Sequence, residues 1–261
     1  MPCTPVLCAR SAPLDMDLQI APVPGLDEFI AGGDVEQKFT FRWTDKDVLW
    51  DWLEFHTLRD PSFYRGPIIS LYYDTPSLDF YGEARNGDYL KTKVRLRWYQ
   101  TVFTSADQTI DCFFEIKRKR GALRHKQRQA LALSAGCLSG DVFSAAQIAN
   151  LPREMGGFTC FNRGILVPML VVEYQRCRYV DAQTGARIAL DFAIGCRRAN
   201  DAYVYGSVPI ESALGVLEVK SKGAELPEFL RPMRRYLNRQ SFSKYALCCQ
   251  RLLDPLAWRY G

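Results

Sequence analysis

Charged residues alternate with apolar ones in stretch after stretch of this chain. The clearest case is VRLRWY, in which Arg95 and Arg97 alternate with Val94, Leu96 and Trp98. Successive side chains of a β-strand point to opposite faces of its sheet, so this spacing puts both arginines on one face and the apolar side chains on the other. Such a chain can fold into a sheet with one basic face and one apolar face.

Seven segments have this strand character, being rich in β-branched and aromatic residues. They are residues 35–43, 68–75, 89–103, 109–120, 169–180, 186–196 and 215–222. Turn-forming sequences at 86–88, 105–107 and 181–185 predict hairpin-type connections, and therefore antiparallel neighbours. Helical periodicity occurs in residues 44–56, 138–151, 226–238 and 241–253. The predicted fold class is mainly β (α+β), with one antiparallel sheet or barrel and attached helices.

Length and composition limit the organisation and the partners of the chain. Residues 1–34 are rich in Pro, Gly and Ala and are expected to be a loosely ordered lead-in, with a single domain over 35–261. A net charge of +5 indicates an anionic partner. No apolar run is long enough for a transmembrane segment or a secretion signal, so a cytoplasmic location is expected. Only two histidines, and nine cysteines without a C-x-x-C pair, argue against a zinc site.

The same alternation places charged residues on one face of six predicted strands. Two interpretations are open: an ordinary solvated face, or the lining of a closed barrel whose apolar face is covered by helices. In a partly dehydrated lining, like charges repel by several kcal/mol in total (about 1–4 kcal/mol per close pair) unless an anion neutralises them. The guanidinium groups of arginine bind phosphate oxygens in pairs, and the ammonium groups of lysine bind them singly, so both suit a linear oligophosphate. Glutamate oxygens suit Mg²⁺ or Mn²⁺. The pattern therefore suggests a phosphate site with a metal.

Eight short motifs occur in a recognisable order. They are VEQKF, LYYDTPSLDFY, VRLRWY, FFEIKRK, EYQRCRY, RIALDF, VLEVKSKG and SFSKY. In this order, over roughly residues 35–250, the chain resembles the polyphosphate polymerase domain of the vacuolar transporter chaperone (VTC) family, a branch of the triphosphate tunnel metalloenzymes. The resemblance implies an antiparallel eight-stranded β-barrel tunnel with helices packed outside. It also implies transfer of the γ-phosphate of ATP to a growing inorganic polyphosphate chain, with Mn²⁺ or Mg²⁺.

The resemblance also implies roles for individual residues. The catalytic residues would be seven basic side chains that line the tunnel: Lys38, Arg95, Arg97, Lys117, Arg176, Arg187 and Lys244. Lys126 and Lys220 would further bind substrate. For Ser243, expected at the start of a helix, two interpretations are open: substrate binding at the helix N-terminus, or an N-cap only. Glu218 matches the metal-binding glutamate of the family, and Glu36 and Asp191 share its predicted face. One position departs from the family pattern, because Ser241 stands where the eukaryotic polymerases carry a lysine.

Two alternative functions remain open from the sequence. A triphosphatase of the same fold would have to activate water, with Glu36 or Glu115 as the candidate base. A non-catalytic polyphosphate-binding module would need only the basic residues. A nucleic-acid-binding protein is not expected, because the lysines and arginines alternate along the strands toward one face and are mixed with carboxylates. The predicted partners are thus ATP and inorganic polyphosphate, with a membrane-protein partner and the oligomeric state left open.

Overall fold

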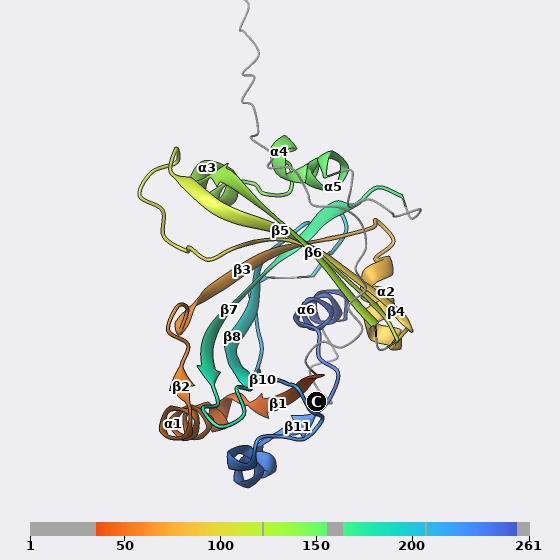
Figure 1. The fold of residues 1–261 in the computed structure, drawn as a ribbon. Coiled ribbons are helices and arrows are strands. Elements are labelled where there is room, and N and C mark those ends of the chain that lie inside the picture. The colour runs from red at the N-terminus through yellow and green to blue at the C-terminus, as the bar shows by residue number, and fades with distance from the viewer. Residues whose placement is uncertain (1–34, 122, 156–163, 207, 255–261) are drawn as a thin grey trace, which may run out of the picture.

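A large antiparallel sheet is the framework of the protein (Figure 1). The computed structural model describes residues 35–121, 123–155, 164–206 and 208–254. The long strands are β1 (Val35–Arg42), β3 (Arg65–Asp74), β4 (Leu90–Trp98), β5 (Thr109–Arg120), β6 (Leu123–Ser134), β7 (Val167–Val180), β8 (Arg187–Ala199) and β10 (Leu214–Ser221). The short strands are β2 (Leu58–Arg59), β9 (Ile210–Glu211) and β11 (Asn238–Arg239).

The strand order is β11-β1-β10-β8-β7-β3-β4-β5-β6, with β2 beside β7 and β9 beside β8. The predicted mainly β, antiparallel class is therefore confirmed. The predicted eight-stranded barrel tunnel is not confirmed, because within the described residues no backbone pairing joins β6 to β1 and the sheet is not closed. The free edge of β1 is instead taken in part by β11, through the pairs Phe39–Arg239 and Thr40–Asn238. Across the gap, the Arg124 side chain of β6 donates to Glu36 of β1 over 2.9 Å.

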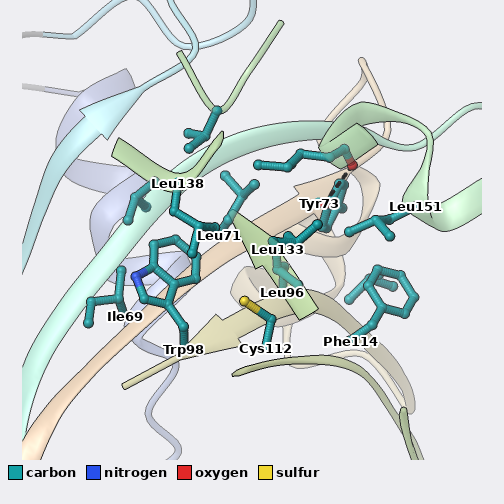
Figure 2. Packing of buried hydrophobic residues seen from close by; sticks show 14 of the residues in the cluster. Ile69, Leu71, Tyr73, Leu96, Trp98, Cys112, Phe114, Leu133, Leu138 and Leu151 are labelled. Atoms are coloured by element: carbon teal, nitrogen blue, oxygen red, sulfur yellow. Dashed lines mark hydrogen bonds between the residues drawn. The ribbon is translucent and has the colours of Figure 1, made fainter. Parts of the chain in front are cut away.

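One face of the sheet, here called the outer face, is apolar and covered by helices, as the alternation predicts. Over β3, β4 and β5 it carries a core closed by α3 (Ala135–Ser139), α4 (Ala146–Ala149) and α5 (Leu151–Glu154). Figure 2 shows Leu71, Leu96, Trp98 and Phe114 packed in this core. The hydroxyl of Tyr73 donates to the carbonyl of Ile148 over 2.8 Å and ties the sheet to α4 (Figure 2). Each large apolar side chain buried in this way contributes roughly 1.5–3 kcal/mol.

A second core covers the outer face of β1, β10, β8 and the end of β7. It is closed by α1 (Lys46–His56), which follows the 3-10 helix η1 (Trp43–Asp45), and by the 3-10 helix η3 (Glu228–Tyr236). Leu49 and Leu53 of α1 are buried there against Phe41 and Leu190. The indole of Trp52 donates to the carbonyl of Phe229 over 2.8 Å and so joins α1 to η3. With both cores in place, the opposite face is left for the charged residues.

The opposite, inner face is covered at one end by α6 (Lys244–Leu253), which lies within the curve of the sheet (Figure 1). Tyr245, Cys248 and Leu252 of this helix are buried with Tyr72 and Ile194 of the sheet. Ser243 caps the helix, because its hydroxyl accepts the backbone N–H of Ala246 over 3.3 Å. Apolar packing thus fills one end of the inner face, and the charged residues occupy the other.

A buried carboxylate fixes α2 (Asp79–Asn86) and α6 to the sheet. Asp74, at the end of β3, accepts hydrogen bonds from the backbone N–H groups of Phe80 and Tyr81 over 2.9 Å each. It also accepts from the hydroxyl of Tyr245 over 2.7 Å. Burial nevertheless raises the pKa of Asp74, against the effect of these hydrogen bonds. Asp74 therefore holds both helices at one end of the inner face.

Several local predictions are corrected by the structure. Strand β6 and helix α2 were not expected, and Gly87 ends α2 with a left-handed backbone (φ 76°) where a strand hairpin was predicted. Residues 138–151 contribute to three short helices in place of one. Pro232 lies inside the segment predicted as helical at 226–238, which is a 3-10 helix. The predicted lead-in over residues 1–34 lies outside the described residues. In the part of the chain that is described, no helix is long and apolar enough to cross a bilayer.

Candidate functional site

A cavity of about 750 Å³ lies on the inner face beside α6, and we call it the basic pocket. Among the described residues, fourteen lysines and arginines line it, but only two acidic residues, Glu36 and Glu218. The bases are Lys38, Lys91, Lys93, Arg95, Arg97, Lys117, Arg118, Lys119, Arg124, Lys126, Arg176, Lys220, Arg239 and Lys244. An ordinary solvated sheet face does not concentrate one sign of charge in a cavity, so the structure favours a built anion site.

On the β4–β5–β6 side of the pocket, a buried carboxylate holds several bases. Glu115 is 2% exposed in its side chain, and its Oε2 accepts from Arg95 Nε over 2.7 Å and lies 2.6 Å from Nη2. Lys126 and Arg128 lie 3.2 and 3.6 Å from its other oxygen. Although burial opposes it, the charges of Arg95, Arg97 and Lys126 hold the pKa of Glu115 well below its ordinary value. Glu115 therefore stays ionised and fixes the direction of the Arg95 fork.

Arg97 is positioned by neutral groups. Its Nε donates to the hydroxyl of Ser70 over 3.1 Å, and its Nη2 donates to the hydroxyl of Tyr174 over 3.3 Å. Glu115 is more distant, at 3.8 Å. Because the hydroxyl contacts leave the Arg97 charge largely uncompensated, this guanidinium is well suited to bind an anion.

On the β7–β8–α6 side, Asp191 plays the same part as Glu115. It is fully buried, and its two oxygens accept from Arg176 Nε and Nη2 over 2.5 and 2.6 Å. Lys244 Nζ donates to Asp191 over 2.6 Å. Although burial opposes it, Arg176 and Lys244 lower the pKa of Asp191. Asp191 thus orients two bases toward the pocket from behind its wall.

Glu218 lies at the centre of the acidic part of the pocket. It is the direct cross-strand partner of Lys38, at 3.4 Å, and it accepts from Arg176 Nη2 over 3.2 Å. Glu36 lies 3.0 Å from the same Lys38 ammonium. Despite burial, Lys38 and Arg176 hold the pKa of Glu218 well below its ordinary value, and the two glutamates raise that of Lys38. The two lining carboxylates are therefore joined through one lysine.

In the described part of the chain, several lysines of the pocket have no such partner, and Lys93 and Lys117 are the two of them whose pKa is shifted. Lys93 and Lys117 are opposed on β4 and β5, and among the described residues neither forms an ion pair. Burial lowers the pKa of Lys93 to about 7, and the charges of Lys38 and Arg95 add to the effect. Burial and Arg95 lower the pKa of Lys117 well below its ordinary value. These two ammonium groups are the strongest sign that the pocket is built for an added anion.

The structure brings together most of the residues selected from the sequence. Those lining the basic pocket are Lys38, Arg95, Arg97, Lys117, Lys126, Arg176, Lys220, Lys244, Glu36 and Glu218. Asp191 lies behind the wall, and Ser243 caps α6; neither lines the pocket. Arg187, at the exposed start of β8, is also outside its lining. The roles of all these residues remain predictions.

The sequence interpretation missed other lining residues. Strand parity predicts Lys93 and Lys119 on the charged face, although they are not among the selected site residues, and Lys91 follows the same parity. Arg239 comes from β11, a two-residue strand with no sequence signal of its own. Ser241 does line the pocket, so the departure from the family pattern falls at the site itself.

The fold and the pocket together define a class of protein, in which a curved antiparallel sheet surrounds a cluster of lysines and arginines. Such a cluster suits a polyphosphorylated anion. The family can be named as well. The family model described as the VTC domain matches residues 54–253, and the chain belongs to this family.

Two solved structures resemble the chain more distantly. One is a candidate adenylate cyclase from Bacillus halodurans, with 13% identity, a TM-score of 0.40, and coverage of 74% of this chain and 81% of that chain. The other is a candidate adenylate cyclase from Vibrio parahaemolyticus, with 13% identity, a TM-score of 0.41, and coverage of 82% and 98%. Neither likeness is close enough to support a function for this chain. No curated protein matches it.

Proposed function

We propose that the basic pocket binds the triphosphate of ATP and transfers its γ-phosphoryl group to inorganic polyphosphate. The observation that carries this proposal is the lining of the pocket, in which fourteen bases face two carboxylates within about 750 Å³. Membership of the VTC family supports an enzyme of the triphosphate tunnel type. The polymerase reaction is the more specific part of the proposal.

Phosphoryl transfer requires the protein mainly to position the reactants and to neutralise the negative charge of the phosphates. In the proposed step the bond from the γ-phosphorus to the β–γ bridging oxygen breaks, and a terminal oxygen of polyphosphate forms the new bond to that phosphorus, releasing ADP. Charge moves onto the bridging oxygen as this happens. Three arginines are already oriented by hydrogen bonds: Arg95 to Glu115, Arg97 to Ser70 and Arg176 to Asp191. Their guanidinium groups therefore need little reorganisation to stabilise the charge on the bridging oxygen.

A general base is not required, because the acceptor oxygen of polyphosphate is already ionised. This favours polymerase over triphosphatase activity. The two glutamates considered as bases for water are poorly placed to take a proton, since Glu115 is bound to Arg95 and Glu36 to Lys38. The pKa of each is lowered, in spite of burial, by these lysine and arginine neighbours.

We propose Mn²⁺ or Mg²⁺ as the cofactor. Within the described residues, no three His, Cys, Asp or Glu side chains converge as a complete metal site. The donor set still fits these ions, which are commonly held by one or two carboxylates together with substrate phosphate oxygens and water. Glu218 and Glu36, which line the pocket, would hold the ion in place of their contacts with Lys38, whereas Asp191 lies behind the wall and is not among the lining residues. When bound, the ion would neutralise charge on the phosphate oxygens.

The proposal is tested by incubating the purified protein with ATP and Mn²⁺, with and without a short polyphosphate primer. Products are resolved on a gel stained for polyphosphate, while ADP and free phosphate are assayed. Long chains with matching ADP support the polymerase. Free phosphate without chains would identify a triphosphatase. Neither product, together with a triphosphate-dependent rise in melting temperature, would identify a binding module.

A further inference from the structure

A second cavity, of about 550 Å³, adjoins the basic pocket at the open edge of the sheet. We call it the edge cavity. Its floor is apolar, with Phe39, Leu226 and Leu237, and its polar groups include Arg231, Arg234 and Arg239. One acidic residue, Glu225, lines it. This excess of arginine points to a second site for an anion.

The two cavities share part of their walls. Gln37 and Arg239 line both of them. Arg239 lies on β11, directly opposite Phe39 of β1, so it stands at the strand pair that separates the inner face from the edge cavity. Gln37 is buried, and its side-chain amide donates to the carbonyl of Ala224 over 2.7 Å, which fixes the loop after β10 against β1. The two cavities therefore adjoin at Arg239 and Gln37.

The arginines of the edge cavity are arranged for such a ligand. Arg231 and Arg234 are three residues apart on η3, so their side chains project from the same side of this 3-10 helix. Arg231 forms an exposed pair with Glu228 over 2.9 Å. Arg234 and Arg239 have no ion-pair partner among the described residues. Arg234 and Arg239 are therefore available to phosphate oxygens without breaking a pair, and Arg231 can exchange its exposed partner Glu228 for a phosphate at little cost.

We propose that the edge cavity binds the part of a polyphosphate chain that extends beyond the basic pocket. This inference rests on the proposed function, and it adds a subsite that only long chains reach. It predicts that affinity depends on chain length, and that part of this dependence comes from η3. Arginine forks favour phosphate oxygens over less densely charged anions, which is why a polyphosphate is the ligand of choice here.

The test compares tripolyphosphate with long-chain polyphosphate by isothermal titration calorimetry. In the double variant R231Q/R234Q, long-chain binding should weaken roughly tenfold or more, because two charge-assisted contacts are lost. Binding of tripolyphosphate should change less than about twofold, since it stays in the basic pocket. The matched control is Arg235→Gln, a neighbouring exposed arginine that stacks on Tyr236 and does not line the cavity. A thermal scan of each variant verifies its fold.

The outcomes separate the two proposals. Equal loss in R235Q, equal loss for both ligands, or no loss at all would overturn the edge-cavity subsite while leaving the function of the basic pocket intact. If the unmodified protein bound neither ligand, both proposals would fail. Loss of binding to anionic lipid vesicles in the double variant, with long-chain polyphosphate unaffected, would assign the arginines to a membrane contact and overturn the inference.

Discussion

Lys93 of β4 and Lys117 of β5 face each other as direct cross-strand partners in the basic pocket, and among the described residues neither has an ion-pair partner. Like charges placed directly opposite each other destabilise a sheet. Burial and the surrounding charges therefore favour loss of a proton from both lysines in the free protein, at the place where we propose that phosphate binds. Two predictions concern this pair.

Triphosphate binding is expected to take up a proton at Lys93. Because the pKa of this lysine is about 7 in the free protein, it is largely neutral at pH 8, and a bound polyanion should raise its pKa. Affinity should consequently fall as the pH rises above about 7, by at most roughly tenfold per pH unit. Calorimetry of tripolyphosphate binding at pH 8, in two buffers of different ionisation enthalpy, measures the uptake.

The variant Lys93→Met should bind with less proton uptake. Lys222→Met, an exposed lysine outside the pocket, should behave like the unmodified protein. If K93M took up as many protons as the unmodified protein, Lys93 would not be the titrating group.

Replacing Lys117 with methionine is expected to stabilise the free protein while weakening triphosphate binding. Methionine keeps much of the side-chain volume but removes a charge that burial and Arg95 disfavour. The free energy of unfolding should rise by about 0.5–2 kcal/mol, as is usual when an unfavourable charge is removed from a functional site. Urea unfolding without ligand measures it, and calorimetry measures the loss of affinity. A less stable K117M, with K222M unchanged, would mean that Lys117 has a structural role.

Glu115→Gln should destabilise the protein and lower its activity. The change leaves Arg95 and its neighbours without their buried counter-charge, a loss of the order of 3–5 kcal/mol in comparable buried pairs. The pKa of Glu115 is lowered in the folded protein, so its contribution is present at neutral pH and is lost as the pH falls through that folded value. The difference from the unmodified protein should therefore hold at pH 7 and shrink only in strongly acidic solution.

Urea midpoints at several pH values test this prediction. Glu228→Gln breaks the exposed pair with Arg231 and should cost less than about 1 kcal/mol. Similar midpoints for the two variants would show that the Glu115 network is not a stabilising one.

Arg97→Lys should lower turnover by about 100-fold or more while the protein remains folded, because a lysine cannot reproduce the fork held by Ser70 and Tyr174. Polyphosphate synthesis and thermal unfolding are measured together. Arg85→Lys, on the exposed side of α2, is the matched control and should keep full activity. Full activity in R97K would remove Arg97 from the proposed machinery.

The alternation of charged and apolar residues along the strands was the sequence feature that predicted most of the fold and of the candidate site. It placed Arg95, Arg97, Lys117 and Glu218 on one face and correctly assigned the apolar face to helices, since a period of two is a direct property of extended backbone. Strand β6 was missed because it alternates Arg124, Lys126 and Arg128 with polar residues, leaving neither face apolar along most of its length.

Other features depend on contacts between distant segments. Helix α2 begins after a turn-like sequence, and the buried Asp74 carboxylate supplies its N-terminal hydrogen bonds from the preceding strand. Closure of the sheet could not be judged from strand patterns, because it depends on which segment takes the edge of β1. That segment is β11, and it brings Arg239 to the site.

The concentration of bases in the basic pocket also shapes the field around the molecule. With fourteen basic and two acidic residues in its lining, the other described residues comprise 17 basic and 22 acidic ones. The small net charge thus conceals an uneven distribution among the described residues, with an excess of basic residues in the pocket lining and an excess of acidic residues outside it. Such a distribution steers anions toward the pocket, over a range set by a screening length of about 8 Å at physiological ionic strength. Encounters with polyanions should therefore be fast, oriented and sensitive to salt.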